Sequence, residues 1–215
     1  MGNQQRGSSK QAETNISTCL NISTLLKACK ENNLTLVESY LRAGEDANHT
    51  EIVSGTELTP LIRASYDGNV LLAKLLLKHG AQVDLQNNDG WSALMAASEN
   101  GHTEVVKLLH DYGAQVDLQD NDGWSALMVA SQNGHTEVVK LLHEYGAQVD
   151  LQNNDGRSAL MAASLNGHTE VVKLLHEHGA QVDQQNNDGW SALMAASLNG
   201  HTEVVKLLRL SLIHI

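Results

Sequence analysis

The sequence of 215 residues contains no phenylalanine, and aromatic residues make up only 3% of it. It also has a single proline. A core built around large aromatic side chains is therefore excluded, although 41% of the residues are hydrophobic. The buried surface must come from Leu, Val, Ala and Met, and this composition suits thin, regular helical layers.

Cysteine is nearly as scarce, because Cys19 and Cys29 are the only two. Two cysteines are too few for a disulfide framework or a cysteine-based zinc site. Unpaired thiols suit a reducing compartment, so we expect a cytoplasmic protein and leave the nucleus open as a second location.

Long apolar runs are also missing. No stretch approaches the ~20 apolar residues that span a bilayer, and the N-terminus lacks the apolar region of a secretory signal peptide. Removal of Met1 would expose Gly2 for myristoylation, but Arg6 stands where that pattern has Ser or Thr. Membrane contact is expected only if Gly2 is acylated, and a membrane-recruited regulatory adaptor is the alternative function.

Basic residues are outnumbered, with 14 Lys and Arg against 25 Asp and Glu and a formal net charge of −11. The excess is concentrated in residues 87 to 185, which carry 14 acids and 4 bases. A surface of this kind repels phosphates, which argues against nucleic acid and favours a protein partner with a basic or mixed surface.

What the sequence does contain is an internal repeat. The stretch NNDGWSALMAAS begins at Asn87 and returns almost unchanged at Asp120, Asn153 and Asn186, and residues 87–119 agree with 120–152 at 29 of 33 positions. Diverged copies precede Asn87. We expect a disordered polar tail over residues 1–18 and a repeat domain over 19–215, with six units at about 19–49, 50–86, 87–119, 120–152, 153–185 and 186–215, the last incomplete.

Each unit has the signals of two short helices. Ser92 can cap the first helix, as Thr59 can in the second unit, where Pro60 follows it. Gly101 ends the first helix, and the second carries the apolar face of HTEVVKLLHDYG before Gly113 stops it. Asp89 and Gly90 predict a tight turn between units, and stacking of neighbours supplies the core.

The stretch DGWSALMAASENGHTEVVKLLHDYGAQVD resembles the ankyrin repeat, whose pattern is D-x-x-G-x-T-P-L-H-x-A-A-x-x-G-H-x-E-V-V-x-L-L-x-x-x-G-A-x-V-N/D. The resemblance covers about 190 residues and implies an all-α solenoid of stacked helix pairs with β-turn fingers. Four copies carry Ser-Ala-Leu-Met where the pattern has Thr-Pro-Leu-His. The first unit has Asn32 and Asn33 where the pattern has a glycine between its helices.

Histidine is plentiful, and His102, His135, His168 and His201 recur in GHTE. Stacked helices lie roughly 8–10 Å apart, whereas zinc ligands lie about 2 Å from the metal, so equivalent histidines cannot share an ion. We therefore expect a structural role for them at the start of the second helix. No G-x-S-x-G, glycine-rich phosphate loop or H-E-x-x-H motif is present, and we expect no catalytic residue, no metal and no cofactor.

The ankyrin resemblance also implies a partner-binding groove. In that family the residue after the turn glycine and the residues that end the first helix face the groove. The resemblance therefore implies a non-catalytic scaffold or adaptor that binds a protein segment. The first set is Trp91, Trp124, Arg157 and Trp190, with Leu58 in the second unit, and the second set is Glu99, Gln132, Leu165 and Leu198, with Tyr66. Trp and Arg often dominate interface energies. The alternative is that each indole only covers the neighbouring turn and that the other changes are drift.

The C-terminal stretch VVKLLRLSLIHI abandons the turn of the other units after Leu208. Its apolar residues, Leu210, Leu212, Ile213 and Ile215, stand where a terminal repeat has a polar face. Either this tail folds back over the last layer or the chain is a shortened form of a longer array. Self-association through the tail is a further expectation.

Overall fold

The computed structural model describes residues 25–53 and 56–213. The predicted polar tail (residues 1–18), Gly2 and Ile215 lie outside the described residues. Helix pairs follow one another along the chain, beginning with residues 25–30 and α2 (Leu34–Arg42). The later pairs are α3 (Pro60–Tyr66) with α4 (Val70–Lys78), α5 (Ala93–Glu99) with α6 (Thr103–Asp111), α7 (Ala126–Gln132) with α8 (Thr136–Glu144), α9 (Ala159–Leu165) with α10 (Thr169–Glu177), and α11 (Ala192–Leu198) with α12 (Thr202–Ile213).

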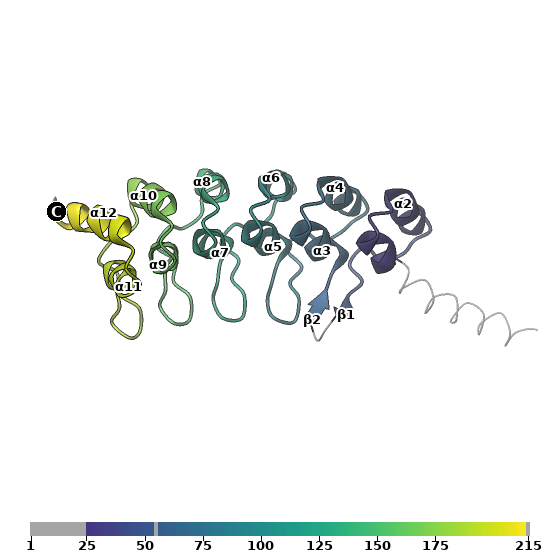
Figure 1. The fold of residues 1–215 in the computed structure, drawn as a ribbon. Coiled ribbons are helices and arrows are strands. Elements are labelled where there is room, and N and C mark those ends of the chain that lie inside the picture. Colours follow the sequence, from purple (N-terminus) through teal and green to yellow (C-terminus); the bar gives the residue numbers. More distant parts are fainter. Residues whose placement is uncertain (1–24, 54–55, 214–215) are drawn as a thin grey trace, which may run out of the picture.

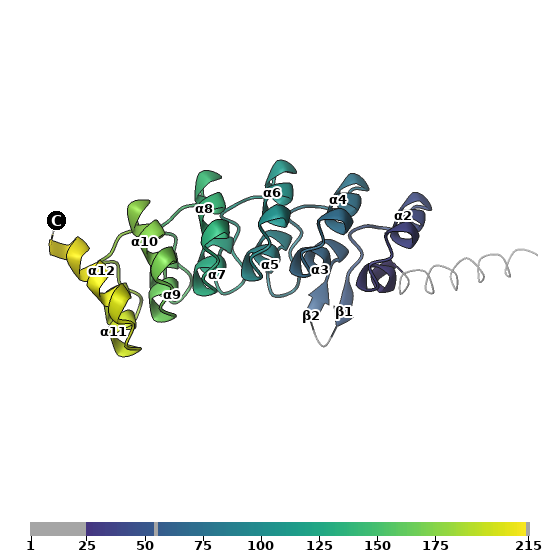
Figure 2. The ribbon, with the colours of Figure 1, turned by 45° about the horizontal axis from the view of Figure 1, so that its top comes forward.

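The pairs stand in single file and give the molecule an elongated shape (Figures 1 and 2). First helices form one layer, second helices form another, and the linking turns project beyond the first helices (Figure 1). First helices pack on the first helices of the next pair, as α5 does on α3 and on α7. The prediction of an all-α solenoid of stacked helix pairs is confirmed. None of the described helices combines the length and the apolar character needed to cross a bilayer.

The predicted caps position the first helices. Ser92 Oγ accepts a hydrogen bond from the Met95 N–H at 3.3 Å, and Thr59 Oγ1 accepts one from the Ile62 N–H at 3.0 Å. Gly101 follows α5 with a φ of 72°. Asn32, which replaces this glycine in the first pair, has a φ of 52°, a left-handed conformation that Asn tolerates better than most residues. The first pair therefore keeps the same reversal without a glycine.

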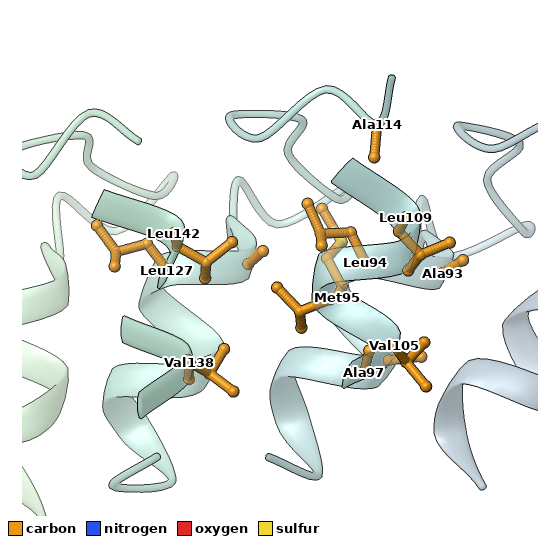
Figure 3. Packing of buried hydrophobic residues seen from close by; sticks show 14 of the residues in the cluster. Ala93, Leu94, Met95, Ala97, Val105, Leu109, Ala114, Leu127, Val138 and Leu142 are labelled. Carbon is orange, nitrogen blue, oxygen red and sulfur yellow. The ribbon is translucent and has the colours of Figure 1, made fainter. Parts of the chain in front are cut away.

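The core is continuous from Leu25 to Leu208. Leu94, Met95 and Val105 of one pair lie beside Leu127 and Val138 of the next, and all five are at most 3% exposed (Figure 3). Each pair thus buries its apolar faces against its neighbours, as a repeat array requires.

Two segments add to the predicted pattern. The loop after the first pair forms a short antiparallel hairpin, β1 (Glu51–Val53) with β2 (Thr56–Leu58), and these are the only strands among the described residues. At the other end α12 continues to Ile213 as one helix, so folding back over the last layer does not occur within the described part of the tail. The glycine that ends α6 is replaced here by Leu212, which lets the helix continue.

Candidate binding groove

A tight turn presents one predicted groove residue from each of the last four units. We call it the finger turn: residues 86–91 and the equivalent residues 119–124, 152–157 and 185–190. Asn87 Oδ1 accepts hydrogen bonds from the N–H of Asp89 at 3.0 Å and of Trp91 at 2.8 Å. The Asn87 N–H donates to the Trp91 carbonyl at 3.0 Å. One short amide side chain therefore fixes the backbone of the groove residue.

The hydrogen bond from the N–H of the groove residue to this side-chain oxygen recurs in every finger turn. This bond was not predicted from the sequence. It joins Asp120 Oδ1 to the Trp124 N–H at 2.7 Å, Asn153 Oδ1 to the Arg157 N–H at 2.8 Å and Asn186 Oδ1 to the Trp190 N–H at 2.7 Å. The signal was available, because Asn or Asp stands four residues before the groove position in all four copies.

Amide side chains also join neighbouring finger turns. Gln86 Nε2 donates to the Gln119 carbonyl at 2.9 Å, and Gln119 Nε2 donates to the Gln152 carbonyl at 3.1 Å. Asn121 Nδ2 donates to the Asn88 carbonyl at 2.9 Å, and the pattern continues to the last turn. The finger turns are thereby held side by side, so Trp91, Trp124, Arg157 and Trp190 form a row with one residue per unit. We call this the finger row.

The last residue of each first helix forms a second row, the helix-end row: Tyr66, Glu99, Gln132, Leu165 and Leu198. The backbone of its first four members is held by the GHTE histidines of the following units. His135 Nε2 lies 2.8 Å from the Glu99 carbonyl oxygen, and His168 Nε2 lies 2.9 Å from that of Gln132. His102 and His201 make the equivalent contacts with Tyr66 and Leu165. The side chains of this row are therefore free to differ while its backbone stays fixed.

These histidines lie at the start of the second helix, as expected, but the rings of His102, His135 and His168 do not cap it. Each ring instead reaches back 36 residues and joins two units. A contact across that separation has no signal in local sequence. In residues 25–53 and 56–213 no group of three or more His, Cys, Asp or Glu side chains could hold a metal ion.

The two rows meet around a hollow of about 240 Å³. It brings together six of the nine predicted groove residues: Trp124, Arg157 and Trp190 from the finger row and Gln132, Leu165 and Leu198 from the helix-end row. Met161 and Ala162 also line it and were not predicted. Trp91, Glu99 and Tyr66 occupy earlier positions of the same rows and lie outside the hollow.

Exposure separates the indoles into two kinds. Trp91 and Trp124 are half-buried and pack against the core, so each has a packing role whatever else it does. Trp190 is 43% exposed and Leu198 is 70% exposed. The indoles in the middle of the array thus pack against the core, and this packing is weakest in the last unit.

The charges of the groove are incompletely paired. Arg157 Nε lies 4.0 Å from Asp155 Oδ2, and the two side chains are 43% and 68% exposed, respectively. Burial raises the pKa of the Glu99 carboxyl. Burial also raises the pKa of Asp120, and backbone N–H groups, chiefly that of Trp124, oppose this rise.

The layer of second helices holds two ring stacks that sequence reasoning missed. His110 stacks on Tyr145, and His143 stacks on His178, both with ring centroids 3.6 Å apart. The partners are 35 residues apart, so a search for equivalent positions at the period of 33 does not pair them. His110 and His143 are on α6 and α8, and Tyr145 and His178 directly follow α8 and α10. These helices lie away from the finger turns (Figure 1).

Comparison with known proteins gives the same repeat. A family model described as ankyrin repeats (3 copies) matches residues 25–120, 61–153, 95–186 and 127–214, which together cover most of the chain.

Individual relatives match parts of the chain. It is 42% identical over 65 residues to the potassium channel AKT1 of Oryza sativa subsp. indica and 44% identical over 69 residues to ankyrin repeat and SAM domain-containing protein 6 of Mus musculus. Those segments are 30% and 32% of this chain, but only 7% and 8% of the two relatives. The human Notch-regulated ankyrin repeat-containing protein is 34% identical over 87 residues, 39% of this chain and 76% of that protein. With the helix pairs, the finger turns and the matched repeats together, the chain belongs to the ankyrin repeat family.

Proposed function

We propose that this ankyrin repeat protein is a non-catalytic scaffold or adaptor that binds a protein segment in the groove between the finger row and the helix-end row. The hollow between Trp124, Arg157 and Trp190 on one side and Gln132, Leu165 and Leu198 on the other carries the proposal. Trp and Arg are the residue types that most often dominate binding energy, and a pocket between them gives an apolar side chain a place to be desolvated.

Rigidity of the groove supports this function. The finger turns are joined by the Gln86 and Gln119 amides, and the helix-end row is held by His135 and His168. A surface fixed before the partner arrives loses little conformational entropy on binding. The groove therefore suits recognition of a segment that is itself ordered by binding.

The charge of the molecule supports a basic or mixed partner. The net charge is −11, and a phosphate-rich ligand would be repelled. Among the matched relatives are a potassium channel and a protein named for Notch regulation, so a shared repeat names no pathway. We place the protein in the cytoplasm, with the nucleus open, on its cysteine content alone.

Two subsidiary proposals concern the ends of the chain. Membrane recruitment depends on acylation of Gly2, which mass spectrometry of the native N-terminus detects. Self-association depends on the apolar residues after Leu208, of which Leu210 is 61% exposed on α12. Sedimentation of the protein at increasing concentration tests it.

The groove is tested by affinity capture with the wild type beside Trp190→Ala. Because Trp190 is 43% exposed, we expect its loss to weaken partner binding by about tenfold or more while the melting temperature changes little. Trp124→Ala should weaken binding and also lower stability, since that indole packs on the core.

The matched control is Tyr112→Ala, which removes an aromatic ring that is 41% exposed next to the second helix α6. Partners lost from both tryptophan variants and kept by the tyrosine variant define the groove's ligands. Partners kept by all three variants would show that binding occurs elsewhere.

A further inference from the structure

The helix-end row changes in character along the array. From the second unit to the last it contains an aromatic, an acid, an amide and two leucines: Tyr66, Glu99, Gln132, Leu165 and Leu198. The two leucines line the hollow, whereas Glu99 lies two units before Leu165. One groove therefore offers an apolar site at one end and a negative charge nearer the other.

The carboxylate of Glu99 makes no ion pair and no hydrogen bond within the part of the chain that the structure describes. Its backbone carbonyl is bonded to His135. Glu104, on the following helix, shows the ordinary arrangement, with its Oε1 2.7 Å from Lys107 Nζ. Glu99 is also half-buried, and burial raises the pKa of its carboxyl. A carboxylate partly removed from water gains most from a cation brought to it.

The neighbours of Glu99 suit a cation as well. In the hollow, Trp124 and Gln132 of one unit line the same space as Arg157 and Leu165 of the next. One unit earlier, the positions equivalent to Trp124 and Gln132 are Trp91 and Glu99. The faces of indole rings attract ammonium and guanidinium groups.

The charges differ between the hollow and Glu99. Arg157 and Asp188 both line the hollow, and among the described residues the one ion pair of Arg157 is its 4.0 Å contact with the exposed Asp155. A partner's Lys or Arg in the hollow would therefore meet charges of both signs, whereas at Glu99 it would meet a carboxylate alone. The apolar side chains that line the hollow, Leu165 among them, favour an apolar side chain there, and Glu99 favours a cation.

We propose, resting on the proposed function, that the groove recognises an extended protein segment at two points, with a Lys or Arg paired to Glu99 and a large apolar side chain in the hollow at Arg157 and Leu165. Helices pack about 8–10 Å apart, so two units span roughly 16–20 Å. An extended chain advances about 3.3 Å per residue, which places the cation about five or six residues from the apolar anchor.

The test uses the full chain and a random peptide library long enough to span three units. We expect the selected peptides to share a Lys or Arg and a large apolar residue at the stated separation. One selected peptide is then synthesised, and its dissociation constant is measured by fluorescence polarisation against the wild type, Glu99→Gln and Glu137→Gln. Glu137 is exposed on α8, so its variant makes the same change of charge away from the finger turns.

Glu99→Gln should weaken binding by about tenfold, the usual value of a hydrogen bond between charged groups. Glu137→Gln should leave it within about twofold, since exposed charges contribute little. A peptide whose Lys or Arg is replaced by Gln should bind the wild type and Glu99→Gln equally.

Equal affinities of the two glutamate variants, with Trp190→Ala still impaired, would overturn the cation site and leave the groove standing. Peptides whose binding survives both Trp190→Ala and Leu165→Ala would overturn the groove itself. Circular dichroism of each variant shows that the fold is retained.

Discussion

At the scale of single residues, the backbone of each groove residue is fixed by the polar side chain four positions earlier in the sequence. Asn87, Asn153 and Asn186 each accept the N–H of the groove residue four positions later. Asp120 does the same for Trp124, but as an acid it must bring a charge into a half-buried site. Burial raises its pKa, although three backbone N–H groups oppose the rise. The neutral amide of the other copies avoids this cost.

Asp120→Asn should therefore stabilise the protein at neutral pH. A raised pKa means that the folded state holds the proton more tightly than the unfolded chain, so the free energy of unfolding falls as pH rises through that pKa. The substitution removes this loss and should raise the melting temperature at neutral pH by about 2 °C. Below the ordinary Asp pKa of about 3.9 the two proteins should differ less.

Thermal melts of both proteins at neutral and acid pH check this, because the other carboxyl groups titrate alike in the two. A wild type that melts at or above the variant at neutral pH would show that the N–H groups outweigh burial.

At this scale, a contact could be predicted only when few residues separate its two partners in the sequence. The capping roles of Ser92 and Thr59 were predictable because the bonds span three residues. The ring of His135 was placed correctly along the chain, but its bond to Glu99 spans 36 residues, and no local pattern encodes it.

At the scale of elements, the contact between one unit's glycine and the next unit's histidine sets how closely helix pairs approach. A Cβ added to Gly101 would lie 2.6 Å from His135 Nδ1. The same glycine has a φ of 72°, which disfavours other residues. Gly113, with a φ of 85°, has the same backbone requirement but nothing within 4 Å of an added Cβ.

These two glycines allow the energetic cost of the left-handed backbone conformation to be measured separately from the cost of disturbing the histidine contact. Gly113→Ala should cost about 1–2 kcal/mol of the free energy of unfolding, the ordinary penalty of a left-handed residue. Gly101→Ala should cost at least about 1 kcal/mol more, because it also displaces the ring that is bonded to Glu99. Denaturant titration of both variants gives the difference. Equal losses would mean that the ring moves away freely.

The helix pairs themselves were predictable from the sequence, because caps, glycines and apolar faces repeat every 33 residues. The hairpin of β1 and β2 was not. It occurs where the linking loop is longer than in the other units, and without a second copy to compare, the loop gave no register for pairing.

At the scale of the whole molecule, position in the array decides what a residue contributes. Met128 and Met194 follow their capping serines by the same three residues, yet they are 1% and 48% exposed. The difference arises because the unit that follows Met128 covers it. Identical sequence therefore has different energetic value in different units.

Met128→Ala should lower the free energy of unfolding by about 2–5 kcal/mol, as loss of a buried methionine does. Met194→Ala should lower it by less than about 1 kcal/mol, because little buried surface is lost there. Denaturant titration of the two variants compares them directly. Similar losses would indicate that the last face is covered in solution.

The candidate groove was predictable as two rows, because the ankyrin resemblance assigns positions to its faces. The hollow was not, since its outline depends on side chains of three units and includes Met161 and Ala162. Neither residue differs enough from its counterparts in other units to attract notice in the sequence.

The hydrogen bonds that the side-chain amides donate from Gln86 to Gln119 and onward have a mechanical consequence. They tie the tips of the turns directly, whereas the helices are joined through apolar packing that tolerates small sliding movements. Flexing of the array should therefore stretch the helical side before the finger side. The spacing between neighbouring residues of the finger row is then constant. A ligand must match this spacing, because its binding cannot change it.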